Sequence, residues 1–337
     1  MGLRILVTGG AGYIGSATAG LLLRHNHSVT VLDDLSRGHK QAVPHGADLV
    51  VGNIADPSCL ERVFSAGRFD AVMHFAAFAE VGESTIVPEL YFRNNSANTL
   101  TLLEAVLAHK VSRFVFSSTA ALYGEPEQIP IVESAPMRPT NPYGESKLQT
   151  ERVLDWFHRI HGLRYASLRY FNAAGAFEEC GENHEPESHL IPLILQVALG
   201  QRDAIDIYGT DYPTADGTCI RDFIHIHDIA MAHLLVLEAL QTSGKLIFNL
   251  GNGSGFSVRE TIDTARRVTR HAIPVRECPR RPGDPAVLVA SSQTIRQMLG
   301  WTPRYDSLES IIDSAWRWHR TRPPHPRESL TSDQKSR

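Results

Sequence analysis

The sequence predicts an α/β fold, with a doubly wound parallel sheet and a smaller α/β unit. Two observations on the first 170 residues support this prediction. Short β-branched runs alternate with segments of helical period, which is typical of parallel strands joined by crossover helices. Several runs are apolar throughout, as expected of strands that helices cover on both faces. We therefore expect strands at residues 4–7, 29–32, 49–51, 71–75, 114–116 and 166–169.

Composition and charge exclude several classes of protein. The 337 residues are 42% hydrophobic and 21% charged, a mixture that is ordinary for a globular chain. A net charge of −4 offers no basic field to nucleic acid. No apolar stretch approaches the roughly 20 residues that cross a membrane. The chain starts with a predicted strand, so we expect no signal peptide. Its four cysteines form no Cys-x-x-Cys pair, which fits a reducing, cytoplasmic location.

A glycine-rich turn follows the first predicted strand. Gly9, Gly12 and Gly15 form a Gly-x-x-Gly-x-x-Gly pattern that leads into a segment with one apolar helical face. Such a turn needs unusual backbone angles, and its amide groups can bind a pyrophosphate where no Cβ intervenes. Alone the pattern is often only a turn, but its strand–turn–helix context indicates a Rossmann-type dinucleotide site.

Asp33 ends the second predicted strand, 18 residues after Gly15 (33 − 15). A ribose-binding acid is expected about 20 residues after the glycines. A carboxylate there would accept hydrogen bonds from both ribose hydroxyls and repel a 2′-phosphate, which favours NAD over NADP. The alternatives are that Asp33 is a capping or turn aspartate, or that the nearby Arg37 serves a 2′-phosphate.

Tyr143 and Lys147 are four residues apart, so they share one face of a predicted helix. A tyrosine of pKa near 10 is a poor base at neutral pH. A neighbouring ammonium, together with the positive nicotinamide of an oxidised cofactor, would favour the phenolate. Thr119, or a serine beside it, ends a predicted strand and could share the proton of a substrate hydroxyl. A lone Tyr/Lys pair is usually structural, but here three signals agree in order and fold context.

The pattern changes after residue 172. Residues 173–188 hold five glutamates, which we interpret as part of a solvated loop before a helix at 190–199. Residues 247–250 look like one more buried strand that returns to the first sheet. We expect a nucleotide-binding domain at 1–171 with returning segments near 222–250, a second domain at 172–319, and a disordered tail at 320–337.

Several stretches resemble the extended short-chain dehydrogenase/reductase family, and within it the UDP-glucose 4-epimerases (UDP-galactose 4-epimerases). The likeness covers nearly the whole chain, to about residue 318, and the tract at 208–228 is its most diagnostic part. The stretches are TGGAGYIG (8–15), HFAAFAEVGES (74–84), FSSTAALYG (116–124), NPYGESK (141–147), LRYFNAAGA (168–176), YGTDYPTADGTCIRDFIHIHD (208–228) and PRRPGDP (279–285).

The resemblance implies NAD as cofactor and a UDP-sugar as substrate, with UDP-glucose and UDP-galactose interconverted by oxidation at C4, rotation of the 4-keto sugar and re-reduction on its other face. Tyr143 would be the catalytic base, Lys147 its electrostatic partner and Thr119 a hydroxyl on the sugar 4-oxygen. Cofactor contacts would come from Gly9, Gly12, Tyr13, Ile14, Gly15, Asp33, Asn53, Ile54, Phe75, Ala76, Ala77, Asn94, Ser117, Tyr143, Lys147 and Tyr170.

Substrate contacts would come from Thr119, Tyr143, Asn172, His189, Leu190, Tyr208, Arg221, Arg281 and Asp284. Among these, the resemblance implies that the two arginines clamp the UDP diphosphate, that Asp284 meets the uridine ribose and that Tyr208 lies along the uracil.

Some positions depart from the family's pattern. Asn53 stands where an aspartate often meets the adenine amino group, and its carbonyl could still accept that bond. His189 replaces an asparagine and Ala79 a lysine of some relatives. Leu288 falls where side-chain bulk limits the sugar 2-position, so the use of N-acetylated sugars stays open.

Other functions also stay open. A 4-epimerase of UDP-GlcNAc or UDP-glucuronate would share every catalytic residue and differ only in the sugar pocket. An NAD-binding regulatory protein could dispense with Tyr143 and Lys147. A 4,6-dehydratase is disfavoured, because such relatives carry Asp-Glu where this chain has Ala120 and Ala121.

We expect no metal site and a homodimer. His225 and His227 have no further ligand nearby in the sequence, so structural roles are the better interpretation, and the glutamates of 178–187 are expected to be solvated. The resemblance implies a homodimer through helices near 90–107 and 145–160. Leu100, Leu103 and Leu107 offer an apolar stripe there, which packing on the chain's own sheet would equally explain.

Overall fold

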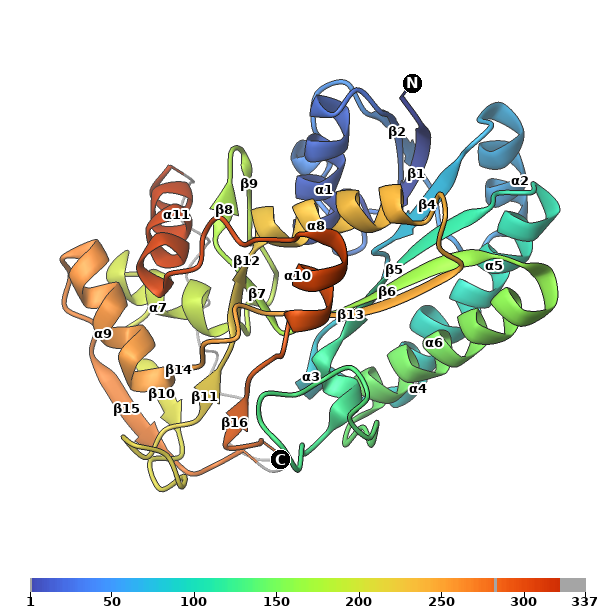
Figure 1. Ribbon diagram of the computed structural model, residues 1–337. Helices are drawn as coiled ribbons and strands as arrows, with labels where there is room; N and C mark the ends of the chain where they lie inside the picture. Colours follow the sequence, from blue (N-terminus) through green and yellow to red (C-terminus); the bar gives the residue numbers. More distant parts are fainter. Residues whose placement is uncertain (1, 282–283, 322–337) are drawn as a thin grey trace.

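The computed structural model describes residues 2–281 and 284–321. Seven strands form one sheet in the order β13-β6-β5-β4-β1-β2-β3, and every neighbouring pair is parallel (Figure 1). The predicted fold class is confirmed, and so are the six predicted strands and the returning strand at 247–250, with ends that differ by up to three residues. The strands are Arg4–Thr8 (β1), Ser28–Asp33 (β2), Asp48–Val51 (β3), Ala71–His74 (β4), Arg113–Thr119 (β5), Arg164–Tyr170 (β6) and Lys245–Leu250 (β13).

Helices cover both faces of this sheet, which explains the uninterrupted apolar runs. Ile5 and Val7 of β1 share one core with helices α1 and α8, whereas Leu6 points into another core with α2, α5 and α6. Successive strand residues face opposite sides, so Ile5, Leu6 and Val7 of β1 each meet an apolar layer. The bounds are Tyr13–Arg24 (α1), Pro57–Ala66 (α2), Asn98–Ala108 (α5), Pro142–His161 (α6) and Ile226–Ala239 (α8).

Helix α6, which carries Tyr143 and Lys147, starts and ends where its sequence dictates. Asn141 is its N-cap and accepts a hydrogen bond from the Gly144 amide through its side chain, and Pro142 occupies the first turn. Gly162 ends the helix in the left-handed conformation with φ of +70°. Packed against α6, the short helices α3 (Val81–Ser84) and α4 (Pro88–Tyr91) lead into a π-helical turn, Phe92–Ala97, before α5. Short 3₁₀ turns occupy Lys40–Ala42 and Ala120–Tyr123.

Apart from the two cores on the faces of the sheet, another hydrophobic core, called the second core below, lies beside the sheet, at the left of Figure 1. Helices α7, α9 and α11 pack there around Ile194, Ile262 and Ile311. Small sheets pair β10 with β15, β12 with β7 and β8 with β9, and place β11 between β14 and β16. The helices are Leu190–Ala198 (α7), Val258–Thr269 (α9), Gln293–Leu299 (α10) and Leu308–Arg320 (α11). The strands are Asn172–Ala174 (β7), Ala176–Phe177 (β8), Cys180–Gly181 (β9), Ile205–Tyr208 (β10), Ile220–Arg221 (β11), Phe223–His225 (β12), Phe256–Ser257 (β14), Val275–Cys278 (β15) and Val287–Leu288 (β16).

After residue 172 the chain returns more than once to the core that contains α1 and α8. Helix α8 and strand β13 do so within the predicted segment near 222–250. A further return, which the sequence does not predict, brings Ile295 of α10 and Trp301 into the core of α1 and α8. The predicted disordered tail, 320–337, lies outside the described residues except for Arg320 and Thr321. None of the helices in the described ranges has the length and apolarity that a bilayer crossing requires.

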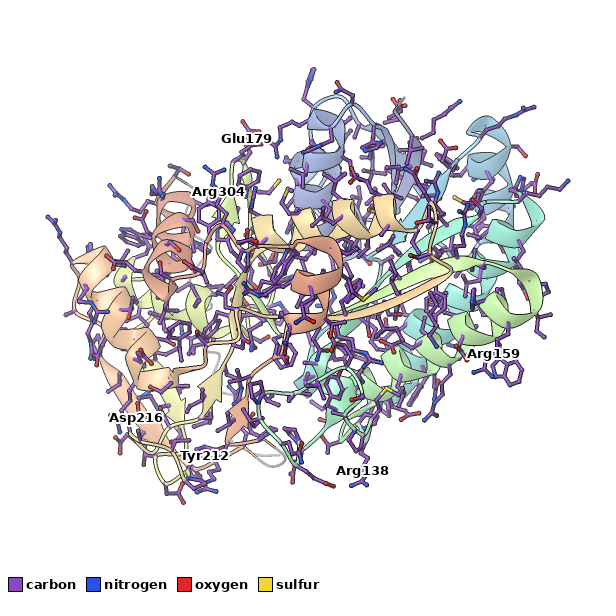
Figure 2. The ribbon with its side chains drawn as sticks, viewed as in Figure 1. Arg138, Arg159, Glu179, Tyr212, Asp216 and Arg304 are labelled. Atoms are coloured by element: carbon purple, nitrogen blue, oxygen red, sulfur yellow. The ribbon has the colours of Figure 1, made fainter. Side chains whose placement is uncertain are left out.

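The glutamate-rich segment 173–188 is only partly the solvated loop that its composition predicts. Glu178, Glu179 and Glu185 are exposed as expected, and Figure 2 labels Glu179 at the tip of the β8–β9 hairpin. The expectation is wrong for Glu182 and Glu187, whose side chains are 5% and 7% exposed. Both carboxylates turn inward because His184 of this segment and His189, which follows it, face them.

Candidate active site

A cleft of about 440 Å³ opens at the carboxyl ends of the central strands. This is the place where doubly wound sheets bind their ligands. Its lining contains every residue that the sequence assigns to the cofactor: Gly9, Gly12, Tyr13, Ile14, Gly15, Asp33, Asn53, Ile54, Phe75, Ala76, Ala77, Asn94, Ser117, Tyr143, Lys147 and Tyr170. Besides Tyr143, which belongs to both predicted sets, three predicted substrate residues line it, Thr119, Asn172 and His189, and so does Leu288.

The glycine turn has no room for side chains. Gly9 has a φ of +74°, and a Cβ on it would lie 2.4 Å from the Ala76 amide nitrogen. A Cβ on Gly15 would lie 2.2 Å from the carbonyl oxygen of Gly9. Gly12 is the N-cap of α1 and supplies no side-chain cap, so the first turn of the helix meets the cleft with its backbone. Such a bare helix start suits the pyrophosphate of a dinucleotide.

Asp33 combines the two roles that the sequence leaves open. Its carboxylate accepts hydrogen bonds from the amides of Ala11 and Leu35, each at 2.9 Å, so it holds the glycine turn in place. Burial raises its pKa, while those backbone bonds act in the opposite direction. Each carboxylate oxygen has a second lone pair, so Asp33 can also accept from ribose hydroxyls.

The residues around Asp33 bear on the choice between NAD and NADP. Arg37, the candidate partner of a 2′-phosphate, instead donates to Glu83 at 2.7 Å. The Asn53 carbonyl, the expected acceptor for adenine, accepts from the Ala55 amide at 2.8 Å, and its NH₂ group donates to Asp34 at 2.6 Å. Asp34 also lines the cleft and adds negative charge near the ribose position. The surroundings therefore fit NAD better than NADP.

Tyr143 and Lys147 lie side by side on α6 and both line the cleft. The Lys147 ammonium donates to the carbonyl oxygen of Ser117 at 2.8 Å and lies 4.9 Å from the centre of the Phe116 ring. Burial lowers the pKa of Lys147 to about 7. Burial also raises the pKa of Tyr143 to about 12, although the Thr119 hydroxyl acts in the opposite direction. The lysine alone therefore does not bring the phenol into working range, and the site needs a further positive charge.

The hydroxyls at the end of β5 differ in their partners: that of Ser118 bonds within the protein interior, and that of Thr119 lies near Tyr143. Ser118 donates to Glu151 at 2.6 Å, within a buried ion pair of Glu151 with Arg169, so it is committed to the interior. The Thr119 hydroxyl accepts from the Ala121 amide at 3.1 Å and remains near Tyr143. Of the strand-end hydroxyls named from the sequence, Thr119 is therefore best placed to share a substrate proton.

The remaining predicted substrate residues lie outside the cleft lining. Arg221 makes an ion pair with Asp284. The Arg281 guanidinium lies 3.8 Å from the centre of the Tyr208 ring. Leu190 starts α7 and packs against the second core. One strand pairing connects this group to the cleft, because Arg221 on β11 lies in register with Leu288 on β16.

Some cleft residues are absent from the sequence-based set. Glu182, His184 and Pro186 come from the segment before α7, and Glu80 and Phe78 come from the segment after β4. The Glu-x-His-x-x-Glu-x-His spacing at 182–189 could have drawn attention to the first group. Its composition was instead interpreted as that of a solvated loop.

The fold and the cleft together define a dinucleotide-dependent enzyme with a Tyr/Lys pair. The chain belongs to the NAD dependent epimerase/dehydratase family, whose model matches residues 5–251. It is 53% identical over 324 residues to the UDP-glucose 4-epimerase of Halalkalibacterium halodurans, covering 95% of this chain and 97% of that protein. It is 54% identical over 322 residues to the UDP-glucose 4-epimerase of Streptomyces lividans, with coverage of 95% and 97%.

Solved structures agree with these relatives. A crystal structure of a UDP-glucose 4-epimerase superposes with a TM-score of 0.92 at 50% identity, covering 94% of this chain and 97% of that one. The UDP-glucose 4-epimerase of Brucella ovis in complex with NAD superposes with a TM-score of 0.91 at 44% identity, with coverage of 94% and 98%. The resemblance drawn from the motifs is confirmed. The chain is an NAD-dependent enzyme of the epimerase class, and the cleft residues fit NAD as its cofactor.

Proposed function

We propose that the enzyme interconverts UDP-glucose and UDP-galactose through a 4-keto sugar. The observation that carries the proposal is that one continuous cleft joins the glycine turn and Asp33 to Tyr143, Lys147 and Thr119. The relatives described above bear the same activity in their names. Bound NAD would supply the acceptor and the donor of the hydride that sugar carbon 4 loses on one face and regains on the other.

Tyr143 is the group that moves the proton in this proposal. It takes the proton of the 4-hydroxyl as the carbon is oxidised, and it returns the proton as the ketone is reduced. The buried phenol has a pKa of about 12, so it becomes a useful base only when the positive charge of the oxidised nicotinamide is beside it. Lys147 positions the nicotinamide ribose, and Thr119 hydrogen-bonds the sugar 4-oxygen.

The second domain, predicted at residues 172–319, would hold the UDP moiety away from the reacting carbon. Arg221 would exchange Asp284 for a phosphate, and Asp284 would then be free for the uridine ribose. Arg281 would likewise leave the Tyr208 ring for the diphosphate, which opens that ring to the uracil. Binding through UDP, remote from carbon 4, lets one site accept both orientations of the sugar. This division supports an NAD domain at 1–171, with returning segments near 222–250, and a UDP-sugar domain at 172–319.

Tyr143→Phe tests the proposal. The variant lacks the hydroxyl but keeps the ring, so turnover of UDP-galactose should fall by roughly 10²–10⁴-fold. Binding of UDP, measured by calorimetry, should stay unchanged, because the phenol is assigned to the sugar end of the cleft. Near-normal turnover in this variant would remove Tyr143 from the mechanism. Complete inactivity of the unaltered enzyme with UDP-galactose would favour a regulatory NAD-binding protein instead.

A second candidate substrate is UDP-GlcNAc. A structural neighbour at 43% identity and a TM-score of 0.84 is the UDP-Glc/GlcNAc 4-epimerase of Campylobacter jejuni. Leu288 lines the cleft where the sugar 2-substituent is expected. Separate incubations with UDP-galactose, UDP-GlcNAc and UDP-glucuronate, followed by product separation, distinguish the three substrates.

We also infer a cytoplasmic homodimer. All four cysteines are free, which supports a reducing compartment. A groove of about 320 Å³ runs between α5 and α6, and large apolar side chains on these helices are exposed: Leu100 by 40%, Trp156 by 60% and Ile160 by 68%. Of the predicted apolar stripe, Leu103 is buried in the chain's own core, whereas Leu100 is exposed and available to a partner subunit. A strictly monomeric species in sedimentation at micromolar concentration would contradict the dimer.

A further inference from the structure

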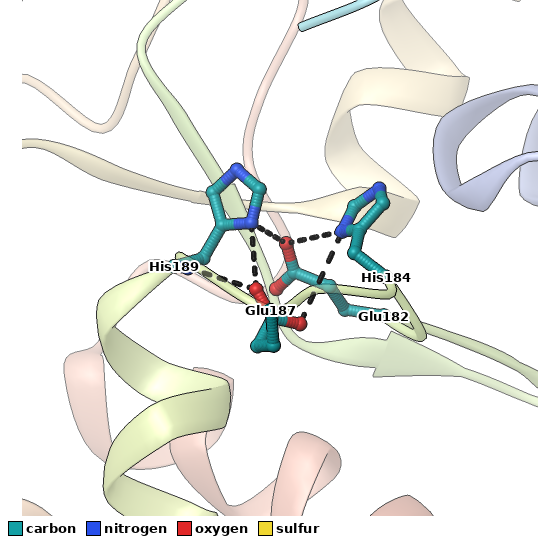
Figure 3. Close-up of side chains that lie close together, drawn as sticks. All are labelled: Glu182, His184, Glu187 and His189. Carbon is teal, nitrogen blue, oxygen red and sulfur yellow. Dashed lines mark hydrogen bonds and ion pairs between the residues drawn. The ribbon is translucent and has the colours of Figure 1, made fainter. Parts of the chain in front are cut away.

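Four side chains of the segment between β9 and α7 point toward one another at the edge of the cleft. They are Glu182, His184, Glu187 and His189 (Figure 3). One imidazole nitrogen or carboxylate oxygen from each lies within 4.8 Å of those of the other three. The proposed epimerisation uses none of these four groups as an acid, a base or a nucleophile.

The distances in this cluster suit a small tetrahedral site. Nδ1 of His189 lies 2.9 Å from Oε1 of both Glu182 and Glu187. Nδ1 of His184 lies 3.4 Å from Oε1 of Glu182 and 4.0 Å from Oε2 of Glu187. With bonds of about 2.0–2.1 Å, tetrahedral zinc holds its ligand atoms roughly 3.3 Å apart. The four separations lie on both sides of that value, so a modest adjustment of side chains would complete the site.

Burial makes the cluster costly without a compensating cation. The side chains of Glu182 and Glu187 are 5% and 7% exposed, and two carboxylates withdrawn from water need positive charge nearby. Nδ1 of His184 is fully enclosed and makes no hydrogen bond, although both carboxylates lie within ion-pair range. An enclosed imidazole nitrogen that faces carboxylate oxygens without a hydrogen bond is arranged like a ligand of a shared cation.

We propose that Glu182, His184, Glu187 and His189 bind one zinc ion. Imidazole nitrogens together with carboxylate oxygens suit zinc, whereas calcium and magnesium prefer oxygen alone. Four protein ligands leave no open position for substrate, so the ion has a structural role.

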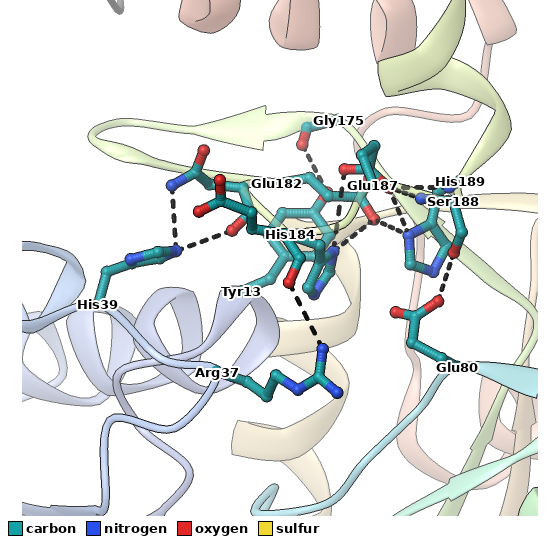
Figure 4. Close-up of polar contacts among 12 residues, drawn as sticks. Tyr13, Arg37, His39, Glu80, Gly175, Glu182, His184, Glu187, Ser188 and His189 are labelled. Carbon is teal, nitrogen blue, oxygen red and sulfur yellow. Dashed lines mark hydrogen bonds and ion pairs between the residues drawn. The ribbon is translucent and has the colours of Figure 1, made fainter. Parts of the chain in front are cut away.

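The zinc ion fixes the segment that closes one side of the cofactor cleft. Figure 4 shows how this segment reaches the cofactor half of the protein. The Arg37 guanidinium donates to the Glu185 carbonyl at 3.4 Å, and the His39 ring contacts the Asn183 carbonyl at 2.8 Å. The Tyr13 hydroxyl donates to the Gly175 carbonyl at 2.5 Å. Glu182, His184 and Glu185 themselves line the cleft. A zinc ion within this segment therefore holds it against the glycine turn, and its removal should speed the release of NAD.

The competing interpretation is a metal-free cluster of buried ion pairs. Burial would lower the pKa of His189, but Glu182 and Glu187 raise it well above its usual range. Burial would raise the pKa of Glu182, but His189 and His184 hold it at about 2. In that case both histidines are protonated and the cluster has no affinity for a cation.

Metal analysis of the full-length enzyme separates the two interpretations. The protein is prepared without a histidine tag, stripped by dialysis against a chelator and titrated with zinc in competition with a chromophoric chelator. We expect about one zinc per chain, and a melting temperature that rises by about 4 °C at a hundredfold excess of zinc over its Kd. Cobalt in place of zinc should give the intense visible absorption of a tetrahedral N/O site. No uptake of zinc by the stripped protein would overturn the proposal.

Variants assign the site to these residues. His184→Ala and His189→Ala should each abolish stoichiometric zinc and the thermal shift. Glu185→Gln, an exposed carboxylate in the same segment, and His161→Ala, an exposed histidine on α6, should retain the zinc. Should an alanine variant fail to fold, His184→Cys keeps a zinc ligand, and its cobalt spectrum should shift to that of a thiolate-containing site. Full zinc content in both alanine variants would overturn the assignment.

Discussion

The cofactor side of the cleft and the segment 172–190 are built in different ways. On the cofactor side, parallel strands end at one edge of the sheet, so the turn at Gly9, the carboxylate of Asp33 and the hydroxyl of Thr119 are brought together by a regular framework. The segment 172–190 has only short strands, and its buried cluster is held by contacts among its own side chains. A regular framework tolerates little change in shape, whereas a segment held by a few polar contacts depends on each of them.

The glycine turn offers the strongest test of the cofactor side of the cleft, which is the regular side. Gly15→Ala places a methyl group within 2.2 Å of the Gly9 carbonyl oxygen, and neither backbone segment can move away freely. We expect the affinity for NAD to fall by roughly 100-fold, since overpacking against a backbone oxygen belongs at the upper end of the usual cost of about 1–3 kcal/mol. Fluorescence titration with NADH measures the effect. Gly82→Ala, which has open space around its Cβ, is the matched control. Equal affinity in the two variants would show that the turn is not rigid.

The sequence predicts the regular side well because its signals are local. A glycine pattern, an acid at a known offset and a Tyr/Lys pair on one helical face each depend on fewer than about 20 residues of chain. The fold then brings them together through strand order alone. By contrast, the inward turn of Glu182 and Glu187 depends on which side chains meet in space, and a glutamate-rich composition carries no such information. The return of α10 to the first core, through Ile295 and Trp301, is missed for the same reason.

Arg221 tests the substrate half, where the effect should be the next largest. Its guanidinium is nearly buried and paired with Asp284, and in the proposed function it exchanges that carboxylate for a phosphate. Arg221→Ala should raise KM for UDP-galactose by roughly 10–100-fold, because a charge-assisted hydrogen bond contributes about 1.5–3 kcal/mol. The turnover number should change little, since the contact is remote from carbon 4. Steady-state kinetics beside Arg280→Ala, an exposed neighbour paired with Asp211, checks this. A fall in turnover with constant KM would contradict the assignment.

Lys147 allows the electrostatics of the regular side to be measured without substrate. Burial lowers its pKa to about 7, whereas the unfolded chain holds the same proton up to about pH 10.4. Between these values the unfolded state binds more protons, so the free energy of unfolding should rise with pH. From pH 7 to pH 9 we expect a gain of roughly 2 kcal/mol relative to Lys147→Met, in which this contribution is absent.

Urea denaturation of the two NAD-free proteins at both pH values measures that difference. The comparison with Lys147→Met cancels the other groups that titrate in the same range. Parallel pH dependences in the two proteins would mean that the ammonium is hydrated in the folded state.

Leu288 tests the boundary between the two regions, where the smallest effect is expected. Leu288 pairs in register with Arg221, the proposed phosphate ligand, and it also lines the cleft. It therefore lies between the proposed UDP contacts and the proposed sugar pocket. Leu288→Ala removes three carbons beside the expected 2-position. The ratio of kcat/KM for UDP-GlcNAc to that for UDP-galactose should rise by about tenfold, since a hydrophobic pocket discriminates a methylene by only 1–3 kcal/mol.

Val287→Ala on the same short strand, which pairs with Ile220 instead, should leave the ratio unchanged. An unchanged ratio in Leu288→Ala would mean that sugar range is set by the irregular segment near His189, which also lines the cleft. In that case the less regular of the two regions would control specificity, while the regular one supplies the chemistry.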